Sequence, residues 1–430
     1  SAWLRTRRFW VQILAGAKIM DVNQKKFFFF LILFNIILRV TASYFFGDTE
    51  VHMEWGRLVH NLNLTGVLGI NVVLNEHIAS PAYAVSGQIV LPSVFMPPLY
   101  AYYIFLLKVI SFDLLSLINI LIFSQIILSC ISIYIFHKIL LKFFKLKLCL
   151  IFSTIFSIFP LYVYSSTQAS SITLQVFLLL FYFFYLLEFL DKKKSKDLIL
   201  FSISSSLLIL TRGEFFFFHL LTLIYFFVFL KFNLKAFLIS IIISIILISP
   251  YLKRNYENFD AFVLTKSFGY NLLKGNNPDL KVEGSINFIE KNFNQKMIKI
   301  ETNNKYEIKL DNFYKNEAYN IIKKDPIIYL NLYFKKILSF LFLDFKSSYL
   351  NYYNPIHIIP KIILSIFSFI GLFLFINKKG FFQFLCIFYI SNIMIFSIFF
   401  ILPRYSLILL PIQLILTFKV FELLRRKFFN

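Results

Sequence analysis

Apolar runs long enough to cross a lipid bilayer recur along most of this sequence, and they constrain its fold more than any other feature. A helix that crosses the hydrocarbon core needs about 20 predominantly apolar residues. The runs 27–46, 114–137 and 360–377 approach that length with at most one charged residue each. Seven further runs have the same character: 148–165, 171–190, 197–211, 214–231, 235–251, 380–401 and 404–424. We therefore predict an all-α polytopic membrane protein with about ten transmembrane helices.

The composition agrees with a membrane protein and argues against a nucleic-acid binder. Hydrophobic residues make up 59% of the chain, well outside the range of soluble globular proteins. The net charge of +22 would suit a nucleic-acid partner, but the lysines collect in short loops between apolar runs. Cytoplasmic loops of membrane proteins have this pattern, because they face anionic lipids. We therefore expect the basic residues to contact membrane lipids, and we expect no nucleic-acid partner.

The basic loops also predict how the chain is threaded. They alternate with loops that are nearly free of positive charge, which indicates that both chain ends are cytoplasmic. The basic residues in question are Lys25, Lys26, Lys138, Lys142, Lys145, Lys147, Lys192, Lys193, Lys194, Lys196, Lys231, Lys235, Lys378, Lys379, Arg425, Arg426 and Lys427. The alternation holds only if the short apolar segment 99–110 does not cross the membrane. We therefore predict a helix there that lies at the outer surface or dips partly in.

This threading divides the chain into four parts. We expect a cytoplasmic N-terminal segment at 1–26 and a transmembrane core at 27–251 that contains a first outer loop, 47–113. A small outer, α-rich domain follows at 252–355, and C-terminal transmembrane helices at 356–430. Late in the outer domain, Pro326 follows Asp325 and predicts the start of a juxtamembrane amphipathic helix that lies on the membrane.

Acidic residues gather where the first run ends, in a chain that has few of them. Asp48, Glu50 and Glu54 lie within seven residues, just past the predicted membrane exit. A carboxylate at this boundary can take a proton from an acceptor hydroxyl as a general base. The same acids can bind a divalent cation, or they can simply begin a solvated loop. The residues alone leave the three interpretations open.

Three arginines lie at outer ends of predicted spans, against the usual bias of positive charge toward the cytoplasm. They are Arg212, Arg254 and Arg404. A guanidinium group suits bidentate contact with phosphate, which makes each a candidate anion-binding residue. Alternatively, each pairs with a nearby acid such as Glu214 or reaches lipid headgroups. Arg39, inside the first run, is a further candidate that an interhelical pair would also explain.

Several short stretches occur in an order that matches a known family. They are Asp48 and the stretches 96–100 (MPPLY), 210–214 (LTRGE), 249–255 (SPYLKRN), 269–272 (GYNL), 275–278 (GNNP) and 403–405 (PRY). The chain resembles the GT-C membrane glycosyltransferases, especially bacterial relatives of the protein O-mannosyltransferases and the lipid A aminoarabinose transferase (glycosyltransferase 39-like). No single stretch is specific, and the resemblance lies in the ordered set.

The resemblance implies an activity and a set of site residues. Members of the family move a sugar from a polyprenyl-phosphate carrier to an acceptor on the periplasmic or lumenal side. In this chain Asp48, or less readily Glu50, corresponds to the catalytic acid. The resemblance places Arg254 and Arg404, helped by Lys253 and Arg212, near the carrier phosphate. It places Asn271, Asn276, Asn277 and Tyr405 along the outer substrate-binding face.

The sequence departs from the family pattern at two places. Many members carry Lys or His where this chain has Met96, and many have an acid in the second outer loop, where residues 165–173 hold none. No metal site and no certain cofactor are therefore predicted, although a divalent cation at the acids of the first loop remains an alternative.

The predicted function is that of a glycosyltransferase. We expect an inverting enzyme of glycan biosynthesis in the bacterial inner (plasma) membrane, with its active site facing the periplasm. The acceptor is a lipid, a glycan or a protein of the cell envelope. A transporter or flippase of lipid-linked sugars, and a non-catalytic membrane scaffold, are the alternatives.

Overall fold

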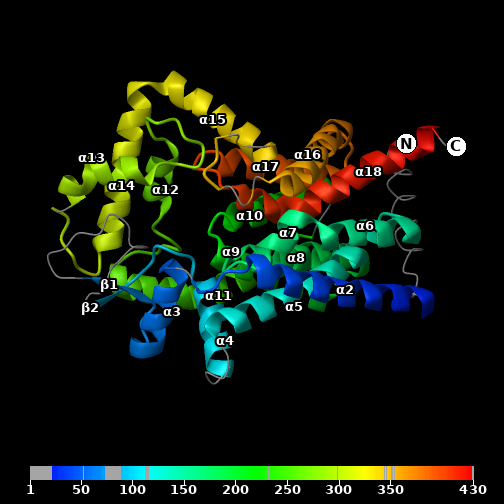
Figure 1. Cartoon of the computed structure of the whole chain (residues 1–430), viewed down its shortest axis with the longest axis horizontal. Coiled ribbons are helices and arrows are strands. Elements are labelled where there is room, and N and C mark those ends of the chain that lie inside the picture. Colours follow the sequence, from blue (N-terminus) through cyan, green and yellow to red (C-terminus); the bar gives the residue numbers. More distant parts are fainter. Residues whose placement is uncertain are drawn as a thin grey trace.

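The computed structural model is 78% helical, which confirms the prediction of an all-α polytopic membrane protein (Figure 1). It describes residues 22–51, 53–72, 89–111, 116–230, 233–297, 299–342, 344, 346–349, 352 and 354–428. Most of the predicted N-terminal segment 1–26 therefore lies outside the described residues.

Every apolar run predicted from the sequence folds as a helix or a pair of helices. These are α2 (Val22–Phe46), α5 (Leu117–Leu140), α6 (Leu146–Ile158), α7 (Pro160–Ser165), α8 (Ile172–Lys192), α9 (Ser195–Thr211), α10 (Phe215–Leu230), α11 (Leu234–Phe259), α16 (Pro355–Phe375), α17 (Phe381–Phe396), and the 3-10 helix η3 (Pro403–Leu409) with α18 (Leu410–Phe428). Among the described residues, six of these helices, with η3 and α18 taken as one, are long and apolar enough to cross a membrane. The other runs form shorter helices, so the number of crossings stays a prediction.

The predicted span 148–165 is broken into α6 and α7. Pro160 has no backbone N–H, so it cannot donate to the carbonyl four residues earlier in a continuous helix. Phe159 adopts an extended conformation at the break, and α7 begins directly at Pro160. The short helix α7 then leads into the loop 166–171.

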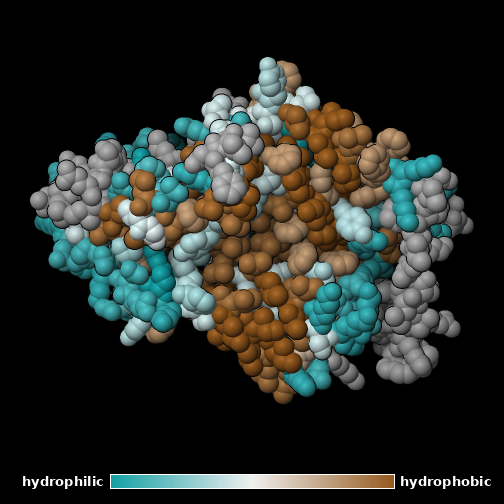
Figure 2. Space-filling view, turned by 90° about the horizontal axis from the view of Figure 1, so that it is seen from below, coloured by the Kyte–Doolittle hydropathy of each residue, from teal (hydrophilic) through white to brown (hydrophobic). Residues whose placement is uncertain are grey.

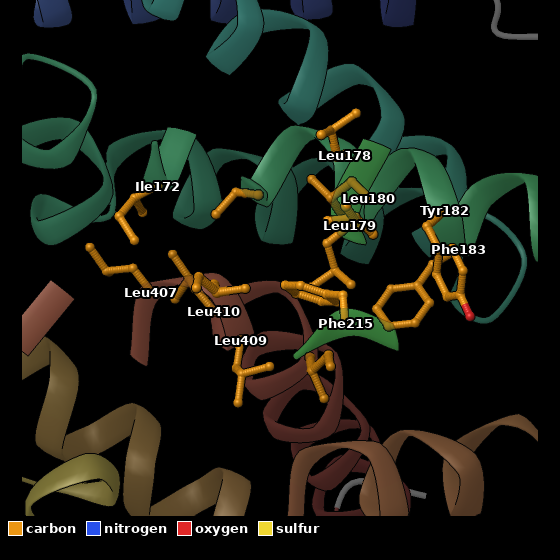
Figure 3. Close-up of a cluster of buried hydrophobic side chains, with 14 of the residues drawn as sticks. Ile172, Leu178, Leu179, Leu180, Tyr182, Phe183, Phe215, Leu407, Leu409 and Leu410 are labelled. Atoms are coloured by element: carbon orange, nitrogen blue, oxygen red, sulfur yellow. The ribbon is translucent and has the colours of Figure 1, made fainter. Parts of the chain in front are cut away.

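The interior of the bundle is formed by α8 and by η3 with α18. About three quarters of the apolar window of each is buried, 72% in α8 and 78% in η3–α18, against 22% in α2. In Figure 3, Leu407 and Leu410 lie beside Ile172 of α8, and Leu179 lies over Phe215 of α10. These side chains belong to one continuous apolar core. The helices that cross the centre of the fold therefore pack on protein, and the outer ones face lipid.

Apolar side chains cover the outside of the bundle in a band (Figure 2). Hydrophobic residues occupy the middle of this face, and hydrophilic residues lie toward both ends of the molecule. On α2, Phe29 and Phe30 are 66% and 63% exposed, and contact with lipid makes such exposure favourable. The helices α9 and α11 instead meet through small polar groups: Ser202 donates to Ser240 at 2.9 Å. Small residues of this kind let membrane helices approach closely.

The first outer loop contains secondary structure that the sequence did not predict. After α3 (Met53–Thr65), a two-stranded antiparallel hairpin forms from β1 (Gly69–Val72) and β2 (Ile89–Pro92), with Gly69 opposite Pro92. The predicted segment 99–110 is helical, as α4 (Pro98–Ser111), and it lies across the direction of α2 and α5 in Figure 1.

The outer domain has a core of its own. The buried hydrophobic residues of α15 (Pro326–Leu341) belong to the core of the bundle, so the separate core is formed by α12 (Phe268–Gly275), α13 (Ile286–Met297) and α14 (Tyr306–Lys324). Phe95 of the first outer loop packs into this core against Tyr270, with ring centroids 5.6 Å apart. The predicted start of α15 at Pro326 is confirmed, with Asp325 as its N-cap.

The two ends of the bundle carry different parts of the chain. In Figure 1 the start of α2 and the end of α18 lie at one end, and α12, α13 and α14 lie at the other. The basic loop after α5 belongs to the first of these ends, where Lys142 pairs with Asp191 of α8 at 2.5 Å. The candidate site residues lie at the opposite end.

Candidate active site

Asp48 is held where α2 ends by the loop 166–171. Its backbone N–H donates to the carbonyl of Thr167 at 3.2 Å, and its carboxylate Oδ2 accepts the N–H of Ala169 at 2.8 Å. The side chain of Gln168 donates to the carbonyl of Phe46 at 2.8 Å, which fixes the end of α2 on the same loop. Asp48 is half-buried, whereas Glu50 is exposed. The loop 166–171 therefore holds the predicted catalytic acid, Asp48, in a fixed position.

Tyr352 lies within electrostatic reach of both Asp48 and Arg404. Burial raises the pKa of Tyr352; the positive charge of Arg404 lowers it, and the negative charge of Asp48 adds to the increase. The Tyr352 ring also meets the ring of Tyr164 edge-on, with centroids 5.0 Å apart. Since Tyr164 belongs to α7, the same short helix that leads to the Asp48 loop supports Tyr352. The charges of a carboxylate and a guanidinium thus both act on one tyrosine.

Arg404 shares its surroundings with a carboxylate and an ammonium group from two other elements. Burial raises the pKa of Glu54 on α3, and the charges of Arg404 and Lys274 act against that increase. Burial lowers the pKa of Lys274 on α12, and Glu54 and Glu283 oppose that decrease. Elements far apart in the sequence, α3, α12 and η3, therefore bring opposite charges together at one end of the bundle.

Aromatic rings hold two of the cations beside Arg404. The ammonium of Lys274 lies 4.4 Å from the centre of the Phe400 ring. The guanidinium of Arg212 lies 4.7 Å from the ring of Tyr405 and 4.5 Å from that of Phe396. The rings of Phe400 and Tyr405 are themselves 5.9 Å apart. Cations over aromatic faces are favoured at partly desolvated positions, so this packing fixes Lys274 and Arg212 close to η3.

The close approach of α12 to the backbone of Phe399 and Phe400 depends on Gly275. A Cβ at that position would lie 2.5 Å from the backbone carbon of Phe399. Any side chain would therefore force the two backbones apart. The glycine that follows Lys274 lets the lysine reach Phe400.

The segment before α16 is tied to the outer domain through Glu283. Its carboxylate accepts hydrogen bonds from the Ser347 hydroxyl and the Ser348 N–H, each at 2.8 Å. This brings Tyr349 within the electrostatic range of Arg404, Glu283 and Glu54, although burial is the main reason for its raised pKa. A tyrosine pair, Tyr349 and Tyr352, consequently faces the charged cluster.

Arg254 and Lys253 contact other groups than Arg404 does. Arg254 donates to the carbonyls of Ser93 and Leu68 at 2.8 and 2.7 Å, and to the side chain of Asn255 at 2.8 Å. It therefore holds the base of the β1–β2 hairpin. Lys253 is 77% exposed and lies 3.7 Å from Glu257. A phosphate-binding role for this pair stays a prediction.

The predicted asparagines lie on α12 and in the turn that follows it, and two of them, Asn276 and Asn277, bond to backbone carbonyls. Asn276 donates to the carbonyls of Leu272 and Ile398 and accepts the ammonium of Lys336 at 3.0 Å. Asn277 is buried and closes the turn that follows α12. Asn271 is half-buried on α12, and Tyr405 stacks with Arg212 as described above.

Several residues of the cluster were not assigned from the sequence. Glu54 was grouped with the acids of the first loop, but Lys274, Glu283, Tyr349 and Tyr352 were not singled out. A signal for Lys274 exists, because it lies between two stretches that carry the family resemblance, 269–272 and 275–278. Across the described part of the chain, no three His, Cys, Asp or Glu side chains come together in a way that would hold a metal ion.

Comparison with known proteins gives matches in structure. No protein-family model matches the sequence, and no curated protein matches it. The apo structure of the Archaeoglobus fulgidus oligosaccharyltransferase aligns with 95% of this chain at a TM-score of 0.55 and 13% identity. Its complex with Zn and sulfate aligns with 92% at 0.53 and 12% identity. A third structure, AglB of the same organism with an inhibitory peptide and a dolichol-phosphate, aligns with 95% at 0.55 and 12% identity. The oligosaccharyltransferase AglB is a GT-C fold glycosyltransferase.

This chain has the GT-C fold. The expectation from the ordered sequence stretches is thereby confirmed at the level of the fold. The chain spans about half the length of the solved proteins that it matches, 52%, 49% and 51% in the three structures. At 12–13% identity the likeness concerns the GT-C fold alone, so the chemistry has to be argued from the residues of this chain.

Proposed function

We propose that this chain is an integral membrane glycosyltransferase that moves a sugar from a polyprenyl-phosphate carrier to an acceptor hydroxyl on the outer side of the membrane. The observation that supports the proposal is that Asp48 and Arg404 both lie within electrostatic reach of Tyr352 at one end of a GT-C bundle. The dolichol-phosphate bound in the AglB complex supports a lipid-linked donor. The predicted compartment, a bacterial periplasm, belongs to the same proposal.

Asp48 is the residue best suited to act as the general base. Its carboxylate takes the proton of the acceptor hydroxyl, and the acceptor oxygen attacks the anomeric carbon of the sugar. The bond between that carbon and the phosphate oxygen breaks, and the carrier phosphate leaves with the electron pair. Attack from the side opposite to the leaving group inverts the anomeric configuration. The anchoring of Asp48 by Ala169 supports its choice over the exposed Glu50.

Arg404 and Lys274 are the cations that we assign to the leaving phosphate. They come from η3 and α12 and share one cluster with Glu54. Cations held in place before the reaction stabilise charge on a leaving group without reorganisation, and loss of one such contact costs roughly 10²-fold in rate. Arg212 supports the pair by packing on Tyr405, the residue that follows Arg404.

A groove lined by residues of α12, α14 and α15 suits the isoprenoid tail of the carrier. Its volume is about 250 Å³, and it is lined by Leu272, Asn276, Ile322, Pro326, Tyr329, Leu330, Tyr333 and Ile398. It continues onto the exposed apolar face of α15, where Ile327 and Leu330 are 70% and 54% exposed. On its inner side the groove reaches Asn276, two residues after Lys274. An apolar chain in this groove would have its phosphate end near the cations.

The proposal is tested with Asp48→Asn in the full chain reconstituted into lipid nanodiscs. The assay follows transfer of label from a radiolabelled polyprenyl-phosphate hexose to bacterial membranes. Because general base catalysis contributes about 10² to 10⁴ in rate, D48N should lose transfer by that factor. Binding of sugar-free polyprenyl phosphate should stay at the wild-type level.

The matched control is Asp260→Asn, an equally conservative change in an exposed acid that pairs with Lys305. D260N should transfer label at the wild-type rate. Wild-type turnover by D48N would remove Asp48 from the mechanism. A wild-type protein that transfers no sugar from any polyprenyl-phosphate donor would contradict the assignment as a glycosyltransferase.

A further inference from the structure

Arg39 is a wholly buried cation in the middle of the first membrane helix. Its position on α2 lies nine residues before Asp48, and its side chain has no exposure to solvent. An arginine at membrane depth costs several kcal/mol, so it is retained where it satisfies a partner or a function. The surroundings of this guanidinium indicate what that partner is.

The guanidinium is bonded to the end of α6. Its Nη1 donates to the carbonyl of Ser157 at 3.0 Å and to the side chain of Asn35 on its own helix. The same group lies 5.1 Å from the centre of the Tyr162 ring on α7. Arg39 therefore contacts both sides of the break between α6 and α7.

The break explains why a donor is needed there. Because Pro160 interrupts the helix, the last carbonyls of α6 lose partners that a continuous helix would supply. An unsatisfied carbonyl in the bilayer core costs several kcal/mol, since water is not available. Arg39 supplies the donor to Ser157, and its planar group packs on Tyr162. The arginine thereby stabilises a broken helix that would otherwise be unfavourable in lipid.

The loop that follows the broken helix supports Asp48. Helix α7 ends at Ser165, and Thr167 and Ala169 then bond to Asp48. The loop is held from a second side by the buried Gln125 of α5, which donates to the Gln168 carbonyl at 2.9 Å. The first membrane helix and the residues that follow it are thus joined to the same segment at Arg39, at Phe46 and at Asp48. The contacts of Arg39 fix the direction of α7, and they thereby fix the loop at its end.

We propose that Arg39 is a positioning residue that holds the α6–α7 break so that the loop 166–171 presents Asp48 in one orientation. The assignment rests on the proposed function for the catalytic importance of Asp48, but the positioning itself is independent of any activity. Arg39 then does more than donate a hydrogen bond to the end of α6. The orientation of Asp48 on the outer face depends on this cation in the membrane interior.

The test is hydrogen–deuterium exchange of the full chain in nanodiscs with Arg39→Met. The backbone N–H groups of Asp48 and Ala169 report on the loop directly, because both are bonded across it. Exchange of peptides covering these two amides should become faster by about tenfold or more in R39M, as expected for loss of a local anchor. Exchange in the outer helices α12 and α14 should stay at the wild-type rate. In a transfer assay R39M should lower kcat and leave KM near its wild-type value.

His219→Phe is the matched control, because it removes a different buried polar group that lies among Ser205 and Ser240. H219F should leave the Asp48 and Ala169 amides unchanged. Should R39M fail to fold, Arg39→Gln replaces it, since this shorter side chain cannot reach both Ser157 and Tyr162. Wild-type exchange at both amides in the folded variant would overturn the proposal. D48N separates the two claims: its asparagine oxygen still accepts the Ala169 N–H, so full activity of D48N would refute the general base and leave the exchange result intact.

Discussion

Replacing Gly275 by alanine should displace Lys274 from the charged cluster. The new Cβ would lie 2.5 Å from the backbone carbon of Phe399 and 2.6 Å from the backbone nitrogen of Phe400. Ordinary contact begins at 3.4 Å, so the shortfall is 3.4 − 2.5 = 0.9 Å. Both contacts are to backbone, which cannot rotate away as a side chain would. The end of α12 must therefore move by roughly that amount.

The energetic consequence has two parts. Overpacking of a tight contact costs about 1–3 kcal/mol, and the better helix propensity of alanine returns up to about 1 kcal/mol. The net loss of folding free energy should lie between about 0 and 3 kcal/mol. In addition, Lys274 moves relative to the Phe400 ring, which now lies 4.4 Å from its ammonium. If Lys274 contacts the carrier phosphate, weakening one charge-assisted contact of about 1.5 kcal/mol lowers affinity about tenfold.

The assay is titration of the purified protein with sugar-free polyprenyl phosphate, followed by native mass spectrometry, together with thermal unfolding. G275A should show about tenfold weaker binding and a lowered Tm. Gly213→Ala is the control, since the nearest atom to its new Cβ is the Thr265 hydroxyl oxygen at 3.7 Å, an ordinary contact. G213A should therefore bind normally. Wild-type affinity and wild-type Tm in G275A would refute the argument from close approach.

Two further predictions concern charge. Arg404→Ala should weaken polyprenyl-phosphate binding by about tenfold to a hundredfold in the same titration. Arg404→Lys should recover part of the affinity, because lysine keeps the charge without the bidentate geometry. Unchanged binding in R404A would remove Arg404 from the phosphate site. Burial raises the pKa of Glu307 from 4.5 to about 7, although Val94 and Ser93 donate to its carboxylate at 2.6 and 2.8 Å. The folded state thus binds the proton more tightly than the unfolded state, so the stabilisation is complete below pH 4.5 and is lost as pH rises through about 7. Exchange protection of the outer domain should fall from pH 5 to pH 8 in the wild type and stay nearly flat in Glu307→Gln; equal slopes would contradict this.

The helices of the bundle were predictable because a bilayer imposes a length and a polarity on every span. The longest runs, such as 27–46 and 404–424, satisfy that constraint in isolation, without knowledge of their neighbours. The β1–β2 hairpin was not predicted, since its strands have four residues each and lie inside a loop of mixed composition. The break at Pro160 was also not assigned, although a proline inside an apolar run is the signal that would have indicated it.

The site was less predictable because its members meet only in three dimensions. Asp48 could be proposed from its place after the first span, but its contact with Ala169 joins positions 121 residues apart. Lys274 and Tyr352 belong to polar stretches in which many lysines and tyrosines look alike. Arg254 shows the converse: a guanidinium that suits phosphate suits backbone carbonyls equally well, and only the fold shows that it donates to Ser93 and Leu68.

The most direct test of the account is a structure of the full chain with bound polyprenyl phosphate, determined by electron cryomicroscopy in nanodiscs. The account predicts the phosphate within about 3.2 Å of the Arg404 guanidinium or the Lys274 ammonium. The tail should lie in the groove along α15, and the Asp48 carboxylate should face the phosphate across the space that a sugar would occupy. A phosphate bound at the opposite end of the bundle, beside the basic loop that carries Lys142, or one turned away from Asp48, would contradict it.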